Sequence, residues 1–278
     1  MNSQQMTLSK ELEAAQELAI RAGEILVEHF GSGDPVRWKA SDDPVTTADY
    51  CVSKMLMTEL RRMFPLDGII SEEEPVDTYQ ARRERIWMVD PLDGTQEFIE
   101  GCGEFAVLIG MTIHGVPKLG VIYEPACPRM LYAVAGDGAY SIEHQHRKKL
   151  TVSGEVEPDR MIFARSRTHH TAEVEHLMER FGARMYVTRG SLGTKIGMIS
   201  RGAAHAYVHA GARTFQWDTC AAEVILRESG GMLTDLQGQP LKYGGVEMRN
   251  LHGVAASNGT LHHRLIHAAQ AKTSAAGV

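Results

Sequence analysis

The sequence predicts an α/β (α+β) fold built as two lobes, on three observations. Apolar residues recur at helical spacing over 8–30 and again over 52–63, which favours two amphipathic helices. Over 105–142 the chain instead reads as a series of β-hairpins rather than as βαβ units. With 278 residues it can bury a large core and fill two lobes. We therefore expect an N-terminal α+β lobe over residues 1–150 and a C-terminal α/β lobe over residues 151–278.

Both expected helices carry end signals. The first ends at Gly31, and its apolar positions are Leu8, Leu12, Ala15, Ala19, Leu26 and Phe30. The second opens near Pro44, where Thr46 or Thr47 would be the N-cap and Asp49 would lie in the first turn. Capping alone explains an acid at Asp49, so a purely structural role for it stays open.

A short apolar strand, Gly68–Ile70, then runs directly into Ser71 and the three glutamates Glu72, Glu73 and Glu74. Adjacent carboxylates repel each other unless a cation or a base compensates them. One of these glutamates pointing into a metal site is consistent with this pattern, whereas Glu74 is expected to face solvent.

The most informative segment is the run from Ile86 to Thr95, in which a buried strand ends in Asp90-Pro91-Leu92-Asp93-Gly94-Thr95. Asp90 would lie at the end of the strand and Asp93 on the turn just after it. Carboxylates and carbonyls held this way suit hard cations such as Mg²⁺. The same residue types favour ordinary turns, so this string alone also allows a structural explanation.

The remaining elements follow from alternation and turn residues. The hairpin strands are expected over 105–113, 119–124, 130–135 and 139–142, and the polar stretch 144–149 is expected to be an exposed connection. In the second lobe, which begins within 143–160, we expect strands over 161–164, 205–208 and 233–235 and helices over 171–181 and 195–201.

A further helix is expected from Phe215 to Leu226, ending at Gly230-Gly231. It has Asp218 in its first turn, and the small residues Ala221 and Ala222 would allow close packing. A helix start also explains an acid at Asp218. Four acidic segments, each at a strand end or a helix start, nevertheless favour one shared site over four unrelated turns.

Composition and charge exclude several function classes. The net charge of −6 and the pI of about 6.1 give no basic surface for a nucleic-acid polymer. No apolar run could span a bilayer, and Met1–Lys10 lacks the layout of a signal peptide. The four scattered cysteines indicate reduced thiols. We therefore expect a cytoplasmic monomer or homodimer without a membrane partner, with His262 and His263 at its surface.

Taken together, the four acidic segments resemble those of the Mg²⁺-dependent, lithium-sensitive phosphatases of the inositol monophosphatase superfamily. That pattern runs T-x-A-D, S/G-E-E, W-x-x-D-P-x-D-G-T and W-D-x-x-A, and the match extends from about Leu8 to Asn258. The resemblance implies a layered αβαβα sandwich with the active site between the lobes, where Asp218 would lie opposite the Asp90–Asp93 turn.

The resemblance also implies roles for single residues. Two or three Mg²⁺ would be held by Glu72, Asp90, the Leu92 carbonyl, Asp93 and Asp218. The catalytic group would be Asp49, Glu72 and Thr95, which activate the attacking water. The Gly94 and Thr95 amides would hold the phosphate, with Asp93 and Asp218 also contacting the substrate.

Within the superfamily, several details are similar to the 3'(2'),5'-bisphosphate nucleotidases, among them Gly94-Thr95-Gln96-Glu97-Phe98, Gly190–Lys195 and Ala206-Tyr207-Val208. This similarity implies substrate contacts from Arg165, Ser166, Lys195 and His209. Arg167 departs from the pattern because a histidine is expected there, and His209 stands where some relatives have an arginine. For Arg165 and Lys195 an ordinary surface charge remains the alternative.

The sequence thus leads to a phosphorylated small molecule as substrate. The first hypothesis is a Mg²⁺-dependent hydrolase that removes the 3'-phosphate of adenosine 3',5'-bisphosphate, giving AMP and phosphate. The alternative is an inositol monophosphatase or broad sugar-phosphate phosphatase with the same metal site. A catalytically silent scaffold of the same fold is a third hypothesis, against which the complete set of acids argues.

Overall fold

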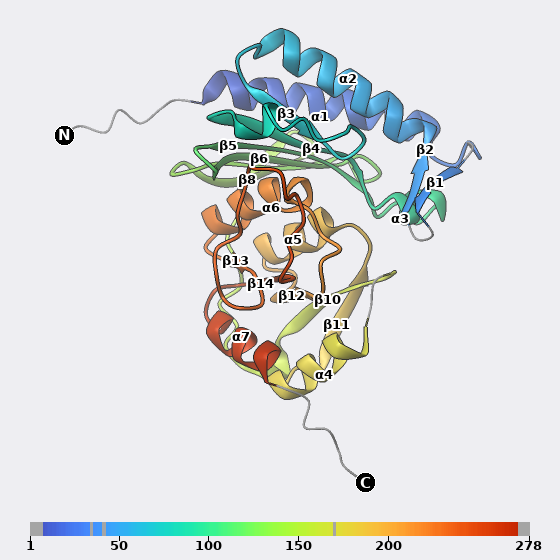
Figure 1. The fold of residues 1–278 in the computed structure, drawn as a ribbon. Coiled ribbons are helices and arrows are strands. Elements are labelled where there is room, and N and C mark those ends of the chain that lie inside the picture. The colour runs from blue at the N-terminus through green and yellow to red at the C-terminus, as the bar shows by residue number, and fades with distance from the viewer. Residues whose placement is uncertain (1–7, 34–35, 41–42, 169–170, 272–278) are drawn as a thin grey trace, which may run out of the picture.

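The computed structural model describes residues 8–33, 36–40, 43–168 and 171–271, which form five alternating layers (Figure 1). Helices α1 (Ser9–His29) and α2 (Thr47–Met63) cover the outer face of a seven-stranded sheet. Helices α5 (Leu192–Ser200) and α6 (Gln216–Glu228) lie between this sheet and a five-stranded one. Helices α4 (Ala172–Phe181) and α7 (His262–Gln270) cover the far face. The predicted αβαβα sandwich is confirmed.

The predicted hairpins supply four of the strands of the seven-stranded sheet. In sheet order its strands are β3 (Gly68–Ser71), β4 (Arg85–Asp93), β5 (Ala106–Ile113), β6 (Val116–Glu124), β7 (Arg129–Val134), β8 (Gly138–Glu143) and β9 (His146–Lys149). All neighbours are antiparallel except β3 and β4. The stretch 144–149 is exposed as expected, but its last four residues pair with β8 as an edge strand instead of forming a loose connection.

The five-stranded sheet has the order β11-β10-β12-β14-β13. Its strands are β10 (Ile162–Ser166), β11 (Met185–Arg189), β12 (Ala206–His209), β13 (Met232–Thr234) and β14 (Val254–Ser257). The chain passes between the two sheets from residue 149 to residue 162, while the division into lobes at residue 150 stays a prediction.

Several short elements have no counterpart among the predicted ones. They are β1 (Val36–Ala40), β2 (Asp43–Thr46), α3 (Thr95–Ile99), β11, β14, α7 and the 3₁₀ turns Gln80–Arg82 and Pro158–Arg160. β11 shows why: it is an edge strand with exposed or half-buried residues throughout, so its sequence carries no apolar alternation. The five residues of α3 are likewise too few to show a helical period.

Helix α6 packs directly on the backbone of the sheet, as its small residues predicted. Gly110 and Gly120 face each other on β5 and β6. A Cβ atom at Gly120 would overlap the Ala221 backbone, and one at Gly110 would lie 2.8 Å from the Ala221 nitrogen. The two glycines therefore let α6, with Asp218 in its first turn, lie close against β5 and β6.

Three further expectations concern the cysteines, membrane-spanning helices and two histidines. The four cysteines are free thiols, as predicted. No helix in the described part of the chain is long and apolar enough to cross a membrane. The surface position predicted for His262 is wrong: it is buried, because α7 turns it toward Thr234 Oγ1 (2.8 Å from Nε2) and Ser257 Oγ (2.9 Å from Nδ1). His263, the next residue, is exposed.

Burial makes His262 a source of acid sensitivity. It lowers the pKa of His262 from 6.5 to about 4, so the folded chain keeps the imidazole neutral while the unfolded chain protonates it first. Between pH 7 and pH 5 the folded state should therefore lose about 2 kcal/mol of stability through this residue. Urea unfolding of wild type and His262→Gln at both pH values measures the effect, since the variant should lose much less stability on acidification. His267→Gln is the matched control, because His267 is an exposed histidine on the same helix, and it should behave as wild type. Equal pH dependence in all three proteins would contradict the assignment.

Candidate active site

A cavity of about 980 Å³ opens where the end of β4, the start of α5 and the start of α6 meet. Its lining includes the four predicted metal carboxylates, Glu72, Asp90, Asp93 and Asp218. It also includes the predicted residues Leu92, Gly94, Thr95, Ser166, Lys195 and His209. The fold thus gathers residues from both sheets and from the helices between them.

The strand β4 positions the two aspartates differently from the expectation. It does not end at Asp90 but continues to Asp93, with one extra residue relative to β5 between them. Pro91 lacks the N–H that a regular ladder needs, which accounts for a bulge at this point. Both aspartates therefore stand on sheet backbone, and Leu92 N–H donates to Asp90 Oδ1 at 3.0 Å.

Asp49 caps helix α2 and also contacts Thr95, while its catalytic role stays a prediction. Thr46 is the N-cap of α2, and its backbone N–H (2.8 Å) and hydroxyl donate to Asp49 Oδ2. The other oxygen, Oδ1, lies 3.3 Å from Thr95 Oγ1, which is also 3.1 Å from the Leu92 carbonyl. Asp49 does not itself line the cavity but stands behind Thr95. The N-cap prediction is confirmed, and capping leaves one carboxylate oxygen for Thr95.

Asp93 joins the seven-stranded sheet to the start of helix α5. Its carboxylate accepts hydrogen bonds from Ser191 Oγ at 2.6 Å, from Leu192 N at 2.8 Å and from Gly193 N. These donors form the first turn of α5, where Ser191 adopts a positive φ of 50°. Gly94, beside Asp93, has a φ of 98°, which favours glycine, and a Cβ there would lie 2.8 Å from the Glu104 carbonyl oxygen.

Burial, and after it repulsion between neighbouring carboxylates, disfavours the charged form of two aspartates in the cavity. Burial, together with Glu72, Asp93 and Asp218, raises the pKa of Asp90 well above its ordinary value. Burial and the nearby Glu72 and Asp93 do the same to the pKa of Asp218, although the Phe215 N–H opposes the shift. A bound cation would relieve this repulsion.

The donor set fits a hard cation. Every predicted ligand offers oxygen and none offers nitrogen or sulfur, which suits Mg²⁺ better than Zn²⁺. Among the residues that the structure describes, no three His, Cys, Asp or Glu side chains are already arranged to hold a metal ion. Some of the aspartate oxygens accept hydrogen bonds from the protein. Asp90 Oδ1 accepts from the Leu92 N–H, and Asp218 Oδ2 accepts from the Phe215 N–H. The metal-ligand assignments stay predictions.

Of the two cationic side chains predicted to contact the substrate, Lys195 lines the cavity and Arg165 does not. Lys195 lines the cavity but is buried, and its ammonium lies 3.5 and 3.3 Å from the carbonyls of Arg189 and Gly190. Burial lowers the pKa of Lys195 despite the nearby carboxylates. Arg165 does not line the cavity: its guanidinium stacks 3.8 Å from the Tyr186 ring centroid.

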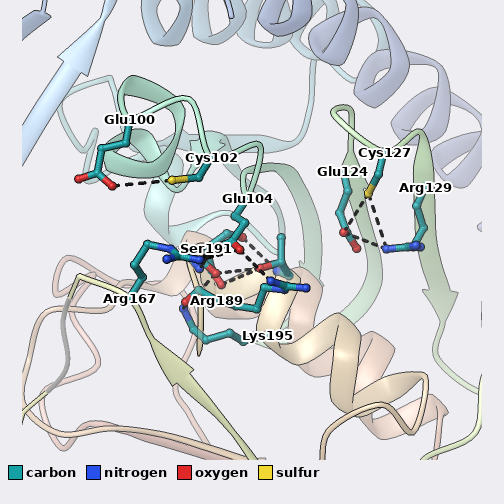
Figure 2. A network of polar contacts seen from close by, with 12 residues as sticks. Glu100, Cys102, Glu104, Glu124, Cys127, Arg129, Arg167, Arg189, Ser191 and Lys195 are labelled. Carbon is teal, nitrogen blue, oxygen red and sulfur yellow. Dashed lines mark hydrogen bonds and ion pairs between the residues drawn. The ribbon is translucent and has the colours of Figure 1, made fainter. Parts of the chain in front are cut away.

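Arg167 belongs to an ion-pair cluster beside the cavity, shown in Figure 2. Glu104 accepts from Arg167 at 2.8–3.1 Å, from Arg189 Nη1 at 2.8 Å and from the Gly190 N–H at 2.8 Å. Although burial opposes ionisation, these donors hold the pKa of Glu104 below its ordinary value. We call Glu104, Arg167 and Arg189 the Glu104 cluster; it fixes the loop before α5 to the loop before β5.

Sequence reasoning missed two arginines and three aromatic side chains of the cavity lining: Trp38, Arg213, Phe215, Trp217 and Arg249. Phe215 and Trp217 were noted only as the start of a helix motif. Arg213 and Arg249 carry no sequence signal, since their proximity depends on a bridge between Phe215 and Arg249 that pairs two distant segments.

The chain is similar to known proteins along most of its length. Residues 7–274 match the model of the inositol monophosphatase family. The 3'(2'),5'-bisphosphate nucleotidase CysQ of Aggregatibacter actinomycetemcomitans is 35% identical over 230 residues, 82% of this chain and 85% of that protein. CysQ of Escherichia coli K12 is 34% identical over 236 residues, 84% of this chain and 93% of that protein.

Solved structures agree in fold. CysQ from Bacteroides thetaiotaomicron, 27% identical, superposes with a TM-score of 0.75 over 91% of this chain and 99% of that chain. The IMPase of Thermotoga maritima, 26% identical, gives a TM-score of 0.80 over 94% of this chain and 96% of that chain.

Proposed function

The chain belongs to the inositol monophosphatase family and is a phosphatase, and from this premise we propose that it removes the 3'-phosphate of adenosine 3',5'-bisphosphate, giving AMP and phosphate. The observation that carries the proposal is the single cavity that gathers Glu72, Asp90, Asp93 and Asp218 around Thr95. The relatives named as bisphosphate nucleotidases, at 34–35% identity over more than four fifths of the chain, favour this substrate.

The residues can be given roles in this reaction. Two or three Mg²⁺, held by Glu72, Asp90, the Leu92 carbonyl, Asp93 and Asp218, would supply Lewis-acid stabilisation of the phosphate oxygens. Thr95 donates a hydrogen bond to Asp49 Oδ1, so its hydroxyl oxygen can accept a hydrogen bond from a water molecule in the cavity and orient that water. Glu72 lines the same cavity and would take the proton that this water loses when its oxygen bonds to phosphorus.

The phosphate itself needs donors. The amides of Gly94 and Thr95 stand at the start of α3, where backbone N–H groups have no carbonyl of the same helix to bond. Both residues line the cavity. We assign these amides to the reacting phosphate.

We further propose that the enzyme is sensitive to Li⁺ and acts in sulfur metabolism. We also propose that it is located in the cytoplasm and is a monomer or a homodimer.

The alternative of an inositol monophosphatase has one specific observation in its favour. The Thermotoga maritima IMPase superposes with a higher TM-score than the Bacteroides CysQ, 0.80 against 0.75, at nearly equal identity. Because fold similarity does not report substrate, we rank this function second.

A phosphate-release panel separates the hypotheses. Adenosine 3',5'-bisphosphate, inositol 1-phosphate and fructose 1,6-bisphosphate are compared at equal enzyme concentration with Mg²⁺, and with EDTA as control. We expect the highest kcat/KM for the nucleotide and no turnover with EDTA. A preference for inositol 1-phosphate would replace the proposed substrate by the alternative. No metal-dependent turnover of any phosphate ester would favour the scaffold.

A further inference from the structure

Arg165 and Lys195, the two cations expected to contact the substrate, are bonded to the protein itself, and so is Arg167. Arg165 and Arg167 are each paired with a glutamate, and neither lines the cavity. Figure 2 shows Arg167 held in the Glu104 cluster. The Lys195 ammonium is buried against backbone carbonyls. A bisphosphate therefore needs other cations for the phosphate that does not react.

Arg213 and Arg249 are exposed and line the same cavity. Phe215 and Arg249 form an antiparallel bridge, so their side chains leave the backbone on the same face. Arg213 lies two residues before Phe215 in the chain and lines the same cavity. The intervening Thr214 is buried, and its carbonyl accepts from the Asn250 N–H at 2.8 Å. Backbone contacts thus hold the segment that carries Arg213 beside the segment that carries Arg249.

The part of the cavity lining around Arg213 and Arg249 offers hydrogen-bond donors, whereas the acidic part offers acceptors. The Phe215 and Trp217 rings stack at 4.7 Å between centroids, and Asp218 follows directly. Trp217 is 6% exposed, and its indole N–H has no acceptor among the described residues. The Arg249 guanidinium likewise has no hydrogen-bond or ion-pair partner in the described part of the chain. Unused donors in a cavity indicate that an oxygen-rich ligand binds there.

From this placement we infer that Arg213 and Arg249 form the subsite for the non-reacting phosphate, an inference that rests on the proposed bisphosphate substrate. A guanidinium matches a phosphate with two parallel hydrogen bonds. The acidic residues would repel this second phosphate wherever no cation compensates them. Arg213 and Arg249 instead attract it, so charges of opposite sign within one cavity would orient the substrate.

Two substrates that differ only in this group test the inference. Adenosine 3',5'-bisphosphate and adenosine 3'-monophosphate present the same reacting phosphate, but only the first carries a 5'-phosphate. Arg249→Ala should lower kcat/KM for the bisphosphate about ten- to a hundredfold, the range for one charge-assisted hydrogen bond. It should change kcat/KM for the monophosphate less than about threefold. Arg213→Ala should act in the same direction, and Arg249→Lys should restore part of the loss.

Arg167→Ala is the matched control, because it removes an arginine from beside the cavity without touching the proposed subsite. It should alter both substrates by the same factor. If wild type gains from the 5'-phosphate but Arg213→Ala and Arg249→Ala keep its substrate ratio, the subsite is wrong and the proposed function stands. If wild type gains nothing from the 5'-phosphate, the proposed function fails and the subsite with it.

Discussion

Asp90→Asn should abolish phosphatase activity and raise the free energy of unfolding measured in EDTA. Asp90 is 2% exposed, and the amide keeps its volume and the Oδ1 acceptor of the Leu92 N–H. The variant removes a charge that burial and three neighbouring carboxylates make costly. Substitution of a residue that hydrogen-bonds to a metal ligand typically lowers metal affinity or activity about 10–100-fold. Substitution of the ligand itself should therefore lower kcat/KM more than about a hundredfold.

Glu74→Gln is the control for Asp90→Asn, because Glu74 is a carboxylate just after β3, the strand that pairs with β4, but is exposed, as predicted. It should leave activity and stability near those of wild type. Phosphate release and urea unfolding of both variants measure the two effects. An Asp90→Asn enzyme with wild-type turnover at ordinary Mg²⁺ would remove Asp90 from the metal site.

Asp93→Asn should also abolish activity, but it should destabilise the fold instead of stabilising it. Its carboxylate accepts from Ser191 Oγ, Leu192 N and Gly193 N. An amide has one acceptor oxygen, and its NH₂ would face one or more of these donors. Leaving a buried donor unpaired costs about 1–3 kcal/mol, so the free energy of unfolding in EDTA should fall by roughly that amount.

Ser191→Ala separates the structural and chemical parts of this effect. It removes one of the three donors and leaves the Asp93 carboxylate in place. The variant should lose stability but keep much more activity than Asp93→Asn. Opposite stability changes in Asp90→Asn and Asp93→Asn are the decisive result, and equal changes would contradict the difference in partners described above.

The predicted parts of the site are those whose signals are local. Thr46 and Asp49 form a cap three residues apart, and the small residues of α6 already indicated its close packing. The partners of the arginines could not be predicted in the same way. Glu104 and Arg167 are 63 positions apart, and nothing in the spacing indicates that their charges meet. Sequence gives the residue types of a site, whereas pairing between distant segments decides which charges remain for a ligand.

The hydrogen bonds of Asp93 also bear on the order of folding. Asp93 and Ser191 are 98 positions apart, so their contact closes one of the longer loops in the chain. Such contacts are entropically costly and form only after nearer ones have restricted the chain. The β-hairpins between β5 and β9 involve near neighbours and need no such closure. The catalytic cavity should therefore be among the last parts of the molecule to assemble, and an intermediate with a complete first sheet would still lack it.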